Sequence, residues 1–397
     1  MRPIHSVGNV VGGALLIAGT MIGVGMLALP VVTGPSGFIP SASIYFICWV
    51  FMVCTALLFV EVSLWLPSDT SFISMADKLL GPIGRHIYWV AYLFLFLTVM
   101  IAHIAGGGSI LCDILSWDVS NRVSSLIYVA VIAPVIYLGT RSVDRINKVL
   151  ISGVILSYLA FVAVSWSSVS YQLLSFTSWS KTWIALPILF TAFTFQIIIP
   201  TLMTYMKRDV PKIRLAIFIG SSIPLVIYLV WEFIILGIVP PDGLTDAARL
   251  GQNAVAPLRY YIANNSIFTI GKAFAFFAMT TSFVPLALSF FDFMADGLKI
   301  KKVGMKKASL VFAIFGIPTI FALIYPNIFL VALGYAGGIS CALLFGLMPP
   351  IMAWVGRYIK KYPSDTRQLP GGKPLLVVLM AFALLILAGE VIQQIPG

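Results

Sequence analysis

The stretch from Ile17 to Pro30, IAGTMIGVGMLALP, carries three glycines within seven residues of the first long apolar segment. Gly19, Gly23 and Gly25 occupy positions where a lipid-facing helix would carry Leu, Ile or Val. Glycine lowers the cost of leaving helical geometry, yet in hydrocarbon a freed backbone group is costly unless it meets a partner. We therefore expect the helix to be interrupted here so that its backbone can hold a ligand. The alternative is that the glycines only let another helix pack closely.

The composition is that of an integral membrane protein. Of the 397 residues, 60% are hydrophobic and 10% are charged, and the mean hydropathy is +1.02, whereas soluble proteins carry about 25% charged residues. No polar stretch is long enough to form a separate soluble domain. We predict an all-α membrane protein in which residues 1–397 form one transmembrane domain, and we expect the first apolar segment to be a retained span rather than a signal peptide.

Eleven apolar runs are long enough to cross the bilayer. They are residues 9–32, 39–66, 87–115, 123–138, 149–168, 183–206, 215–239, 267–293, 308–324, 328–354 and 375–393. Two connections are longer than simple turns. Residues 74–80 read as a short surface helix, and residues 244–261 read as a helix across the outer mouth, either a gate or a plain surface helix.

Loop charge predicts the orientation of the chain. The net charge is +11, and all but five of the 25 Lys and Arg residues fall on the same side of the membrane as the N-terminus; the exceptions are Arg122, Lys181, Arg249, Arg259 and Lys272. Because positive loops stay inside, we expect a cytoplasmic N-terminus and a periplasmic C-terminus. The positive charge therefore implies no nucleic-acid partner.

An interrupted first span would offer two kinds of backbone group. Its second half would begin near Gly25 and Met26, with N–H groups and the positive end of the helix dipole available to a carboxylate. Carbonyl groups released near Gly19 and Ile22 would suit a cation.

The sixth span is interrupted in a similar way. Residues 190–200 read FTAFTFQIIIP, and a proline removes a backbone hydrogen bond and kinks a helix. Interrupted segments in corresponding positions of two halves indicate a transporter's binding site. We expect inverted repeats at about 9–170 and 183–355, followed by an extra helix at 375–393. A proline kink with no ligand role is the alternative.

Several stretches together resemble one family along nearly the whole chain. They are residues 18–30, LFVEV at 58–62, PSDT at 67–70, GSSIPL at 220–225, TSF at 281–283, FDFMAD at 291–296 and ALGYAG at 332–337. The chain resembles the hydroxy/aromatic amino acid permeases of the amino acid–polyamine–organocation superfamily, and is most similar to the tyrosine-specific members. The resemblance implies a five-plus-five inverted repeat with discontinuous helices 1 and 6. It also implies a bacterial inner-membrane location and proton symport of an aromatic amino acid by alternating access.

The resemblance also implies a substrate site. The N–H groups near Gly23, Gly25 and Met26 would bind the substrate carboxylate, and carbonyls near Gly19 and Ile22, with Phe190 and Phe193, would take the ammonium. The full expected set is Gly19, Thr20, Ile22, Gly23, Gly25, Met26, His103, Phe190, Phe193, Thr194 and Gln196. Relatives often have Phe-Gly-Phe-His at residues 193–196, and some have tyrosine at position 103. These departures leave open whether tyrosine, tryptophan or phenylalanine is preferred.

Ionisable groups inside spans are costly and tend to be functional. His103, with an ordinary pKa of about 6.5, would contact substrate or carry a proton; the alternative is a packed histidine bonded to a backbone carbonyl. Glu61 would be a proton site or pair with an inner-side base, and Glu232 and Glu390 are weaker candidates. Thr281 and Ser282 would suit sodium, since hydroxyl oxygens are ligands for hard cations. The family resemblance favours the proton.

Other function classes find little support in the residues. A membrane-embedded enzyme would need a metal cluster, paired carboxylates, a phosphate-binding loop or a nucleophile with its base, and the sequence shows none of these patterns. A channel would need repeated pore-lining residues. We expect no enzymatic activity, no cofactor and no metal. The expected partners are an aromatic L-amino acid, a proton and the lipid bilayer, with tryptophan, broad aromatic or sodium-coupled transport as alternatives.

Overall fold

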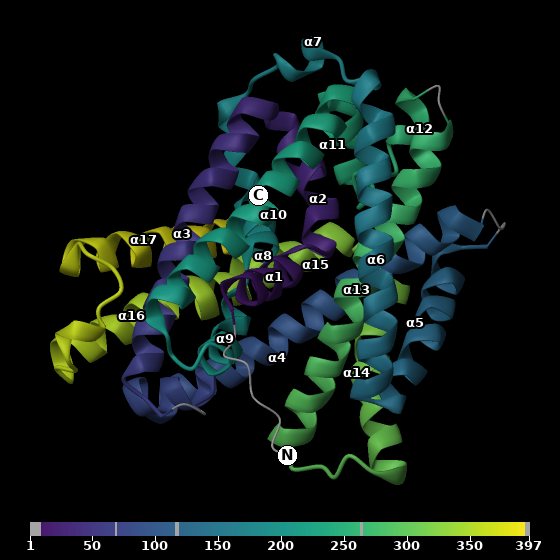
Figure 1. Cartoon of the computed structure of the whole chain (residues 1–397). Coiled ribbons are helices and arrows are strands. Elements are labelled where there is room, and N and C mark those ends of the chain that lie inside the picture. Colours follow the sequence, from purple (N-terminus) through teal and green to yellow (C-terminus); the bar gives the residue numbers. More distant parts are fainter. Residues whose placement is uncertain (1–8, 68–69, 116–118, 263–264, 394–397) are drawn as a thin grey trace.

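The computed structural model describes residues 9–67, 70–115, 119–262 and 265–393, and in these residues the only regular structure is helical (Figure 1). Among the residues described, ten helices are long and apolar enough to cross a membrane, and a bent pair of shorter helices can form an eleventh span. The predicted all-α membrane architecture is therefore confirmed, and eleven spans result when the bent pair is counted as one span.

The bent pair is the first span. Helix α1 (Val10–Met21) begins at Asn9, whose side chain accepts a hydrogen bond from Gly12 N–H, and α2 (Val24–Thr33) follows after two extended residues. The two helices are bent by 57°. A short 3₁₀ turn, η1 (Gly34–Ser36), leads into the second span.

The other spans have bounds close to those expected. They are α3 (Phe38–Leu64), α4 (Phe72–Leu115), α5 (Asn121–Leu138), α6 (Thr140–Ser165), the segment α8 (Leu186–Phe193) with η4 (Gln196–Ile198) and α9 (Ile199–Tyr205), α10 (Val210–Ile238), α13 (Asn265–Gly297), α14 (Gly304–Ile324), the segment α15 (Phe329–Tyr335) with the π-helix η5 (Ala336–Leu347) and α16 (Met348–Trp354), and α17 (Gly372–Gln393). The division into inverted halves stays a prediction.

Three boundaries differ from the sequence prediction. The expected helix over 74–80 is the first part of α4, joined to the third span across Gly81, which has a positive φ of 76°. Helix α6 begins at Thr140 rather than 149, because its inner turns carry exposed charges that a hydropathy pattern misses. The single helix over 244–261 is wrong: α11 (Pro241–Arg249) and α12 (Leu258–Tyr261) flank a non-helical segment that starts near Gly251, where φ is 63°.

The packing places the broken spans in the interior. Helix α1 packs along α10, α2 packs against α8 and α11, and α13 packs against α6 and α4. In Figure 1, α8, α10 and α15 lie near the centre, whereas α17 and α5 lie at opposite edges. The breaks in the first and sixth spans are therefore surrounded by other helices rather than by lipid.

Candidate functional site

The break in the first span is built on two glycines. Ile22 is extended and Gly23 has φ of 177° and ψ of −143°, so helical hydrogen bonding stops after Met21. A methyl group at Gly23 would lie 2.6 Å from Ser282 Cβ, and one at Gly25 would lie 2.7 Å from Ala192 Cα. The glycines therefore serve both purposes considered from the sequence: they flank a break, and they bring α13 and α8 close to it.

The start of α2 exposes backbone donors at this break. The first N–H groups of a helix have no intrahelical acceptor, and no side chain of the described residues caps α2. Ile22 N–H still donates to Ala18 O at 3.1 Å, and Met26 N–H donates to Gly23 O at 3.2 Å. The N–H groups of residues 23–25 and the positive end of the α2 dipole together suit an anion.

The sixth span breaks at the same place in the bundle. Helix α8 ends at Phe193, Thr194 is extended, and the chain resumes as η4 and α9. Phe195 N–H donates to the Gln196 side chain at 3.0 Å, which satisfies one donor that the helix has released.

Tyr228 on α10 joins the two breaks. Its hydroxyl oxygen lies 2.6 Å from Met21 O, at the end of α1, and 3.0 Å from Ala192 O, near the end of α8. A hydroxyl carries one hydrogen, so it cannot donate fully to both carbonyls. The negative ends of two helix dipoles thus converge on a single donor, an arrangement that suits an additional cationic group.

His103 and Ser282 form a third side of the break. His103 Nε2 lies 2.9 Å from Ser282 Oγ, and Nδ1 lies 2.8 Å from Val99 O. Because a carbonyl only accepts, Nδ1 carries a hydrogen. The single hydroxyl hydrogen of Ser282 is shared between Nε2 and the carbonyl oxygens of Ala278 and Met279, each 3.0 Å from Oγ. The ring is buried and stacks on Phe283. The bond to Val99 O matches the packed, carbonyl-bonded alternative, and contact with substrate or a coupled proton stays a prediction.

The predicted aromatic residues of the sixth span point in different directions. Phe193 lies beside the break, with ring centroids 5.3 Å from Tyr228 and 5.8 Å from Tyr45. Phe190 instead packs on Phe51 of α3 and Phe382 of α17.

The predicted polar residues of the same span form hydrogen bonds with other protein groups. Gln196 donates to Thr55 Oγ1 at 2.9 Å on α3, and the Thr194 hydroxyl donates to Phe190 O at 2.6 Å. The structure thus gathers Ile22, Gly23, Gly25, Met26, His103 and Phe193, but turns Phe190 and Gln196 away from them. Gly19 and Thr20 are exposed, within the last turn of α1 before the break.

The two hydroxyls considered for sodium face different helices. Thr281 donates to Asn147 Oδ1 of α6 at 2.7 Å, whereas Ser282 lies against Gly23 and His103. Only Ser282 therefore reaches the break in the first span.

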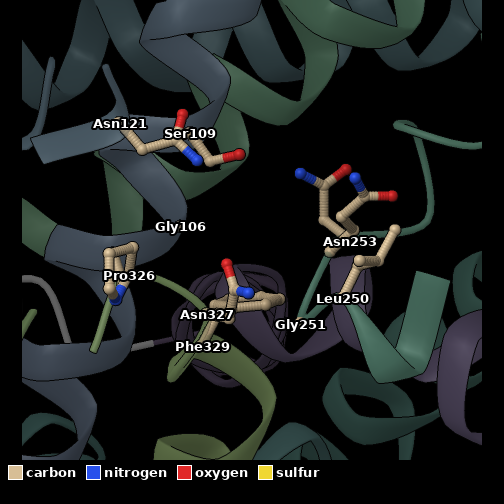
Figure 2. Close-up of a pocket in the computed structure, with 11 residues that line it drawn as sticks. Gly106, Ser109, Asn121, Leu250, Gly251, Asn253, Pro326, Asn327 and Phe329 are labelled. Carbon is tan, nitrogen blue, oxygen red and sulfur yellow. The ribbon is translucent and has the colours of Figure 1, made fainter.

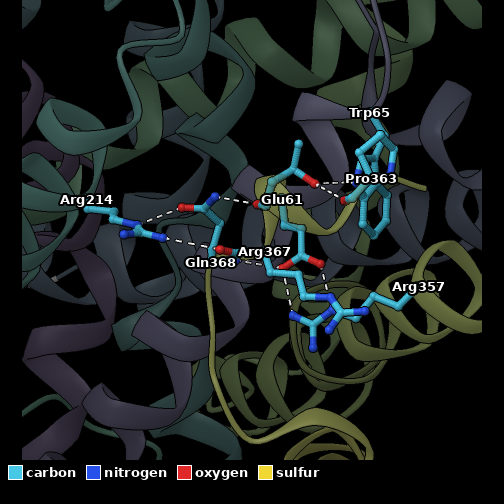
Figure 3. Close-up of polar contacts among 8 residues, drawn as sticks. Glu61, Trp65, Arg214, Arg357, Pro363, Arg367 and Gln368 are labelled. Carbon is cyan, nitrogen blue, oxygen red and sulfur yellow. Dashed lines mark hydrogen bonds and ion pairs between the residues drawn. The ribbon is translucent and has the colours of Figure 1, made fainter. Parts of the chain in front are cut away.

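Glu61 lies in an ion pair away from the break (Figure 3). Its carboxylate accepts from Arg357 Nε at 2.6 Å and from the other arm of the same guanidinium at 2.7 Å, and the backbone N–H of Gln368 donates at 2.9 Å. The carboxylate is fully buried. Its pairing with an inner-side base matches the structural alternative, because the bidentate pair ties α3 to the end of the tenth span and to the segment before α17.

A small polar pocket is lined by residues of α4 that follow His103 in the sequence, together with residues of the outer loops (Figure 2). It has a volume of about 110 Å³ and carries no charged group among its lining residues, which include Gly106, Ser109, Asn121, Asn253, Asn327 and Phe329. Gly106 follows His103 by three residues, roughly 4.5 Å along the helix. The segment beside the pocket is fixed to α2, since Ala254 N–H donates to Leu27 O at 2.9 Å. The pocket therefore lies close to the broken first span.

Sequence reasoning missed Tyr228 and Tyr45. Each is an aromatic residue inside an apolar span, and 13% of the chain is aromatic. Only the three-dimensional arrangement singles them out, so no local pattern could have found them.

Comparison with known proteins gives matches over almost the whole chain. Residues 7–389 match the tryptophan/tyrosine permease family. The tyrosine-specific transport system 1 of Haemophilus influenzae is 33% identical, with 95% of each chain covered. The tryptophan-specific transport protein of the same organism is 28% identical, with 96% of each chain covered. The low affinity tryptophan permease of Escherichia coli is 27% identical, with 97% of this chain and 96% of the relative covered.

Proposed function

The chain belongs to the tryptophan/tyrosine permease family, and from this premise we propose that it imports an aromatic L-amino acid, tyrosine in the first place, together with a proton. The family consists of permeases, so the enzyme alternative is excluded and aromatic amino acid transport across a membrane is the activity. The observation that carries the proposed substrate site is the convergence of two broken helices on Tyr228.

The proposed binding mode follows from the charges of a zwitterion. The carboxylate would sit at the uncapped start of α2, near the N–H groups of residues 23–25. The ammonium would lie by the carbonyls of Met21 and Ala192, at the negative ends of α1 and α8. The aromatic ring would extend past Phe193 toward His103, since aromatic pairs add to apolar burial.

Two observations support tyrosine as the substrate, and a third supports the proton over sodium. The relative with 33% identity is a tyrosine-specific system, and the His103–Ser282 pair offers polar atoms that a phenol can meet. Thr281, one of the two hydroxyls that a sodium site would use, is engaged by Asn147 on a different helix. A sodium ion would therefore lack one of the ligands expected for it.

The proposed transport cycle is alternating access between the pocket of Figure 2 and the opposite side of the membrane. In this cycle the pocket is the outer entrance, and the predicted orientation has a cytoplasmic N-terminus and a periplasmic C-terminus in the bacterial inner membrane. The two broken helices would move relative to the unbroken helices of the predicted inverted repeats.

Uptake into proteoliposomes tests the proposal. Radiolabelled tyrosine should accumulate when the outside is more acidic than the vesicle interior, equally with and without sodium. Unlabelled tyrosine should compete for this uptake better than tryptophan or a non-aromatic amino acid. Accumulation that requires sodium would replace the proton by sodium as the coupled ion. Stronger competition by tryptophan would replace tyrosine by tryptophan as the substrate.

A further inference from the structure

One buried carboxyl group near the breaks has no role in the proposed site. Glu232 lies on α10 and its side chain is fully buried (0% exposed). It is six residues from the end of α10, or roughly 9 Å, on the side that we propose is periplasmic. The ion pairs of the described residues all involve other carboxylates. An ionised carboxylate here would be costly, because its charge is buried without a counter-ion.

The contacts of Glu232 call for an extra hydrogen. Its Oε2 accepts from the Tyr45 hydroxyl at 2.6 Å, and its Oε1 lies 2.5 Å from Thr33 Oγ1. Thr33 Oγ1 also lies 2.7 Å from Leu29 O. The threonine hydroxyl has one hydrogen, and a carbonyl can only accept. With Glu232 ionised, the single hydroxyl hydrogen of Thr33 is shared between the carboxylate and Leu29 O, whereas a protonated Glu232 can donate to Thr33 while Thr33 donates fully to Leu29 O.

The groups around Glu232 offer no other source of charge. Helix α3 contributes Tyr45 and the hydroxyl of Ser41, α2 contributes Thr33, and α10 contributes Tyr228 one turn away. The charged residues of α11, which packs on α2, are exposed. The described contacts of Glu232 therefore include no basic side chain, and a proton on the carboxyl group would remove its buried charge.

A continuous set of contacts connects Glu232 to both breaks. The ring of Tyr45 packs edge-on against Phe193, and Phe193 packs edge-on against Tyr228. Tyr228 in turn bonds to the carbonyls that end α1 and α8. Thr33, which changes from donor to acceptor when Glu232 is protonated, belongs to α2, the helix whose start faces the substrate carboxylate.

We propose that Glu232 is the binding site of the co-transported proton. The proton adds to a carboxylate oxygen in the outward-facing form and leaves to water on the inner side in the inward-facing form, so no other reactant is needed. Protonation reorients the hydrogen bond at Thr33 and thereby favours the arrangement of α2 that holds substrate. This inference rests on the proposed proton symport and adds the residue that carries the proton.

The test compares three purified variants in proteoliposomes. Glu232→Gln keeps the size and the neutral charge of the protonated side chain but binds no proton. We expect it to exchange labelled for unlabelled tyrosine across the membrane at a rate within about threefold of wild type, but to lose accumulation driven by a pH gradient and the substrate-induced current. Glu390→Gln, a buried glutamate of α17, serves as the control and should keep pH-driven accumulation, and His103→Gln tests the competing proton site.

Tyr45→Phe provides a second and independent readout. The ring keeps its contact with Phe193, but the carboxylate loses one donor. A hydrogen bond to a charged group favours the ionised form, so its removal should raise the midpoint of the pH dependence of uptake by about one to two pH units. A purely structural Glu232 would leave this midpoint unchanged.

The outcomes separate this inference from the proposed function. If wild type shows no pH-driven accumulation, proton symport itself fails. If wild type accumulates substrate and Glu232→Gln does so equally, the inference is overturned while symport stands. Loss of accumulation in His103→Gln, with Glu232→Gln unaffected, would assign the proton to His103. If Glu232→Gln neither exchanges nor folds, a wild-type pH midpoint in Tyr45→Phe would overturn the inference.

Discussion

The substitution Gly25→Ala should separate the two broken helices. The added methyl group would lie 2.7 Å from Ala192 Cα, 2.8 Å from Ala192 Cβ and 3.3 Å from the Ala192 backbone nitrogen. These atoms belong to the backbone and β-carbon of α8, so no flexible side chain can move aside. Overpacking of this kind costs about 1–3 kcal/mol.

The expected loss of tyrosine affinity follows from that cost. If α2 and α8 move apart and the binding geometry bears the strain, affinity should fall by roughly 5- to 150-fold, since 1.4 kcal/mol corresponds to a factor of ten. Equilibrium binding of labelled tyrosine to purified protein measures this change. Gly19→Ala is the matched control, because a methyl group there meets no atom within 4 Å, and its affinity should stay near wild type.

The opposite pattern would refute the reasoning. Wild-type affinity in Gly25→Ala, with a loss in Gly19→Ala, would mean that substrate binds near the exposed end of α1 rather than between α2 and α8. A thermal unfolding curve for each variant shows whether the strain appears as lost stability instead of lost binding.

Further substitutions probe other parts of the site. Tyr228→Phe should weaken tyrosine binding about five- to tenfold, since a lost hydrogen bond amounts to about 1 kcal/mol. Tyr158→Phe is the control: it loses a hydroxyl bond to Ile227 O elsewhere on α10 and should bind tyrosine like wild type. Equal affinities of the two variants would remove Tyr228 from the site. Ser282→Ala should raise the KM for tyrosine uptake more than Thr281→Ala does, and a larger effect of Thr281→Ala would favour the sodium alternative. Glu61→Gln should lower the free energy of unfolding by about 3–5 kcal/mol, because it leaves Arg357 buried without its partner. Chemical denaturation of the purified protein measures this loss, and a free energy of unfolding within about 1 kcal/mol of wild type would contradict the prediction.

Helix positions were predictable because the bilayer imposes them. A span must satisfy its backbone internally, so apolar length predicted the spans, and the close spacing of Gly19, Gly23 and Gly25 marked the break at Gly23. The start of α6 was missed because Arg141 and Arg145 belong to a helix that continues beyond the apolar core. The split of the outer segment into α11 and α12 begins at Gly251, whose positive φ ends α11; this glycine is a local helix-stop signal that the single predicted helix over 244–261 overlooked.

The directions of side chains were less predictable than the helices. Phe190 and Phe193 lie three residues apart in a short helix, yet one meets α17 and the other meets α10. Thr281 and Ser282 are adjacent, and a helix turns by about 100° per residue, so they necessarily reach different neighbours. Sequence analysis placed both pairs at the site as units, and the structure separates the members of each pair.

The unbroken helix α10 gives these separate contacts a common support. Tyr228 and Glu232 are four residues apart, so they lie on the same face, one turn from each other. The first bonds to the ends of α1 and α8, and the second contacts α2 and α3. Under the proposal that Glu232 binds the co-transported proton, a shift of α2 alters the surroundings of Glu232, and by reciprocity the proton changes the affinity of α2 for a carboxylate. The proposed coupling needs no direct contact between proton and substrate, because α10 contacts the surroundings of both.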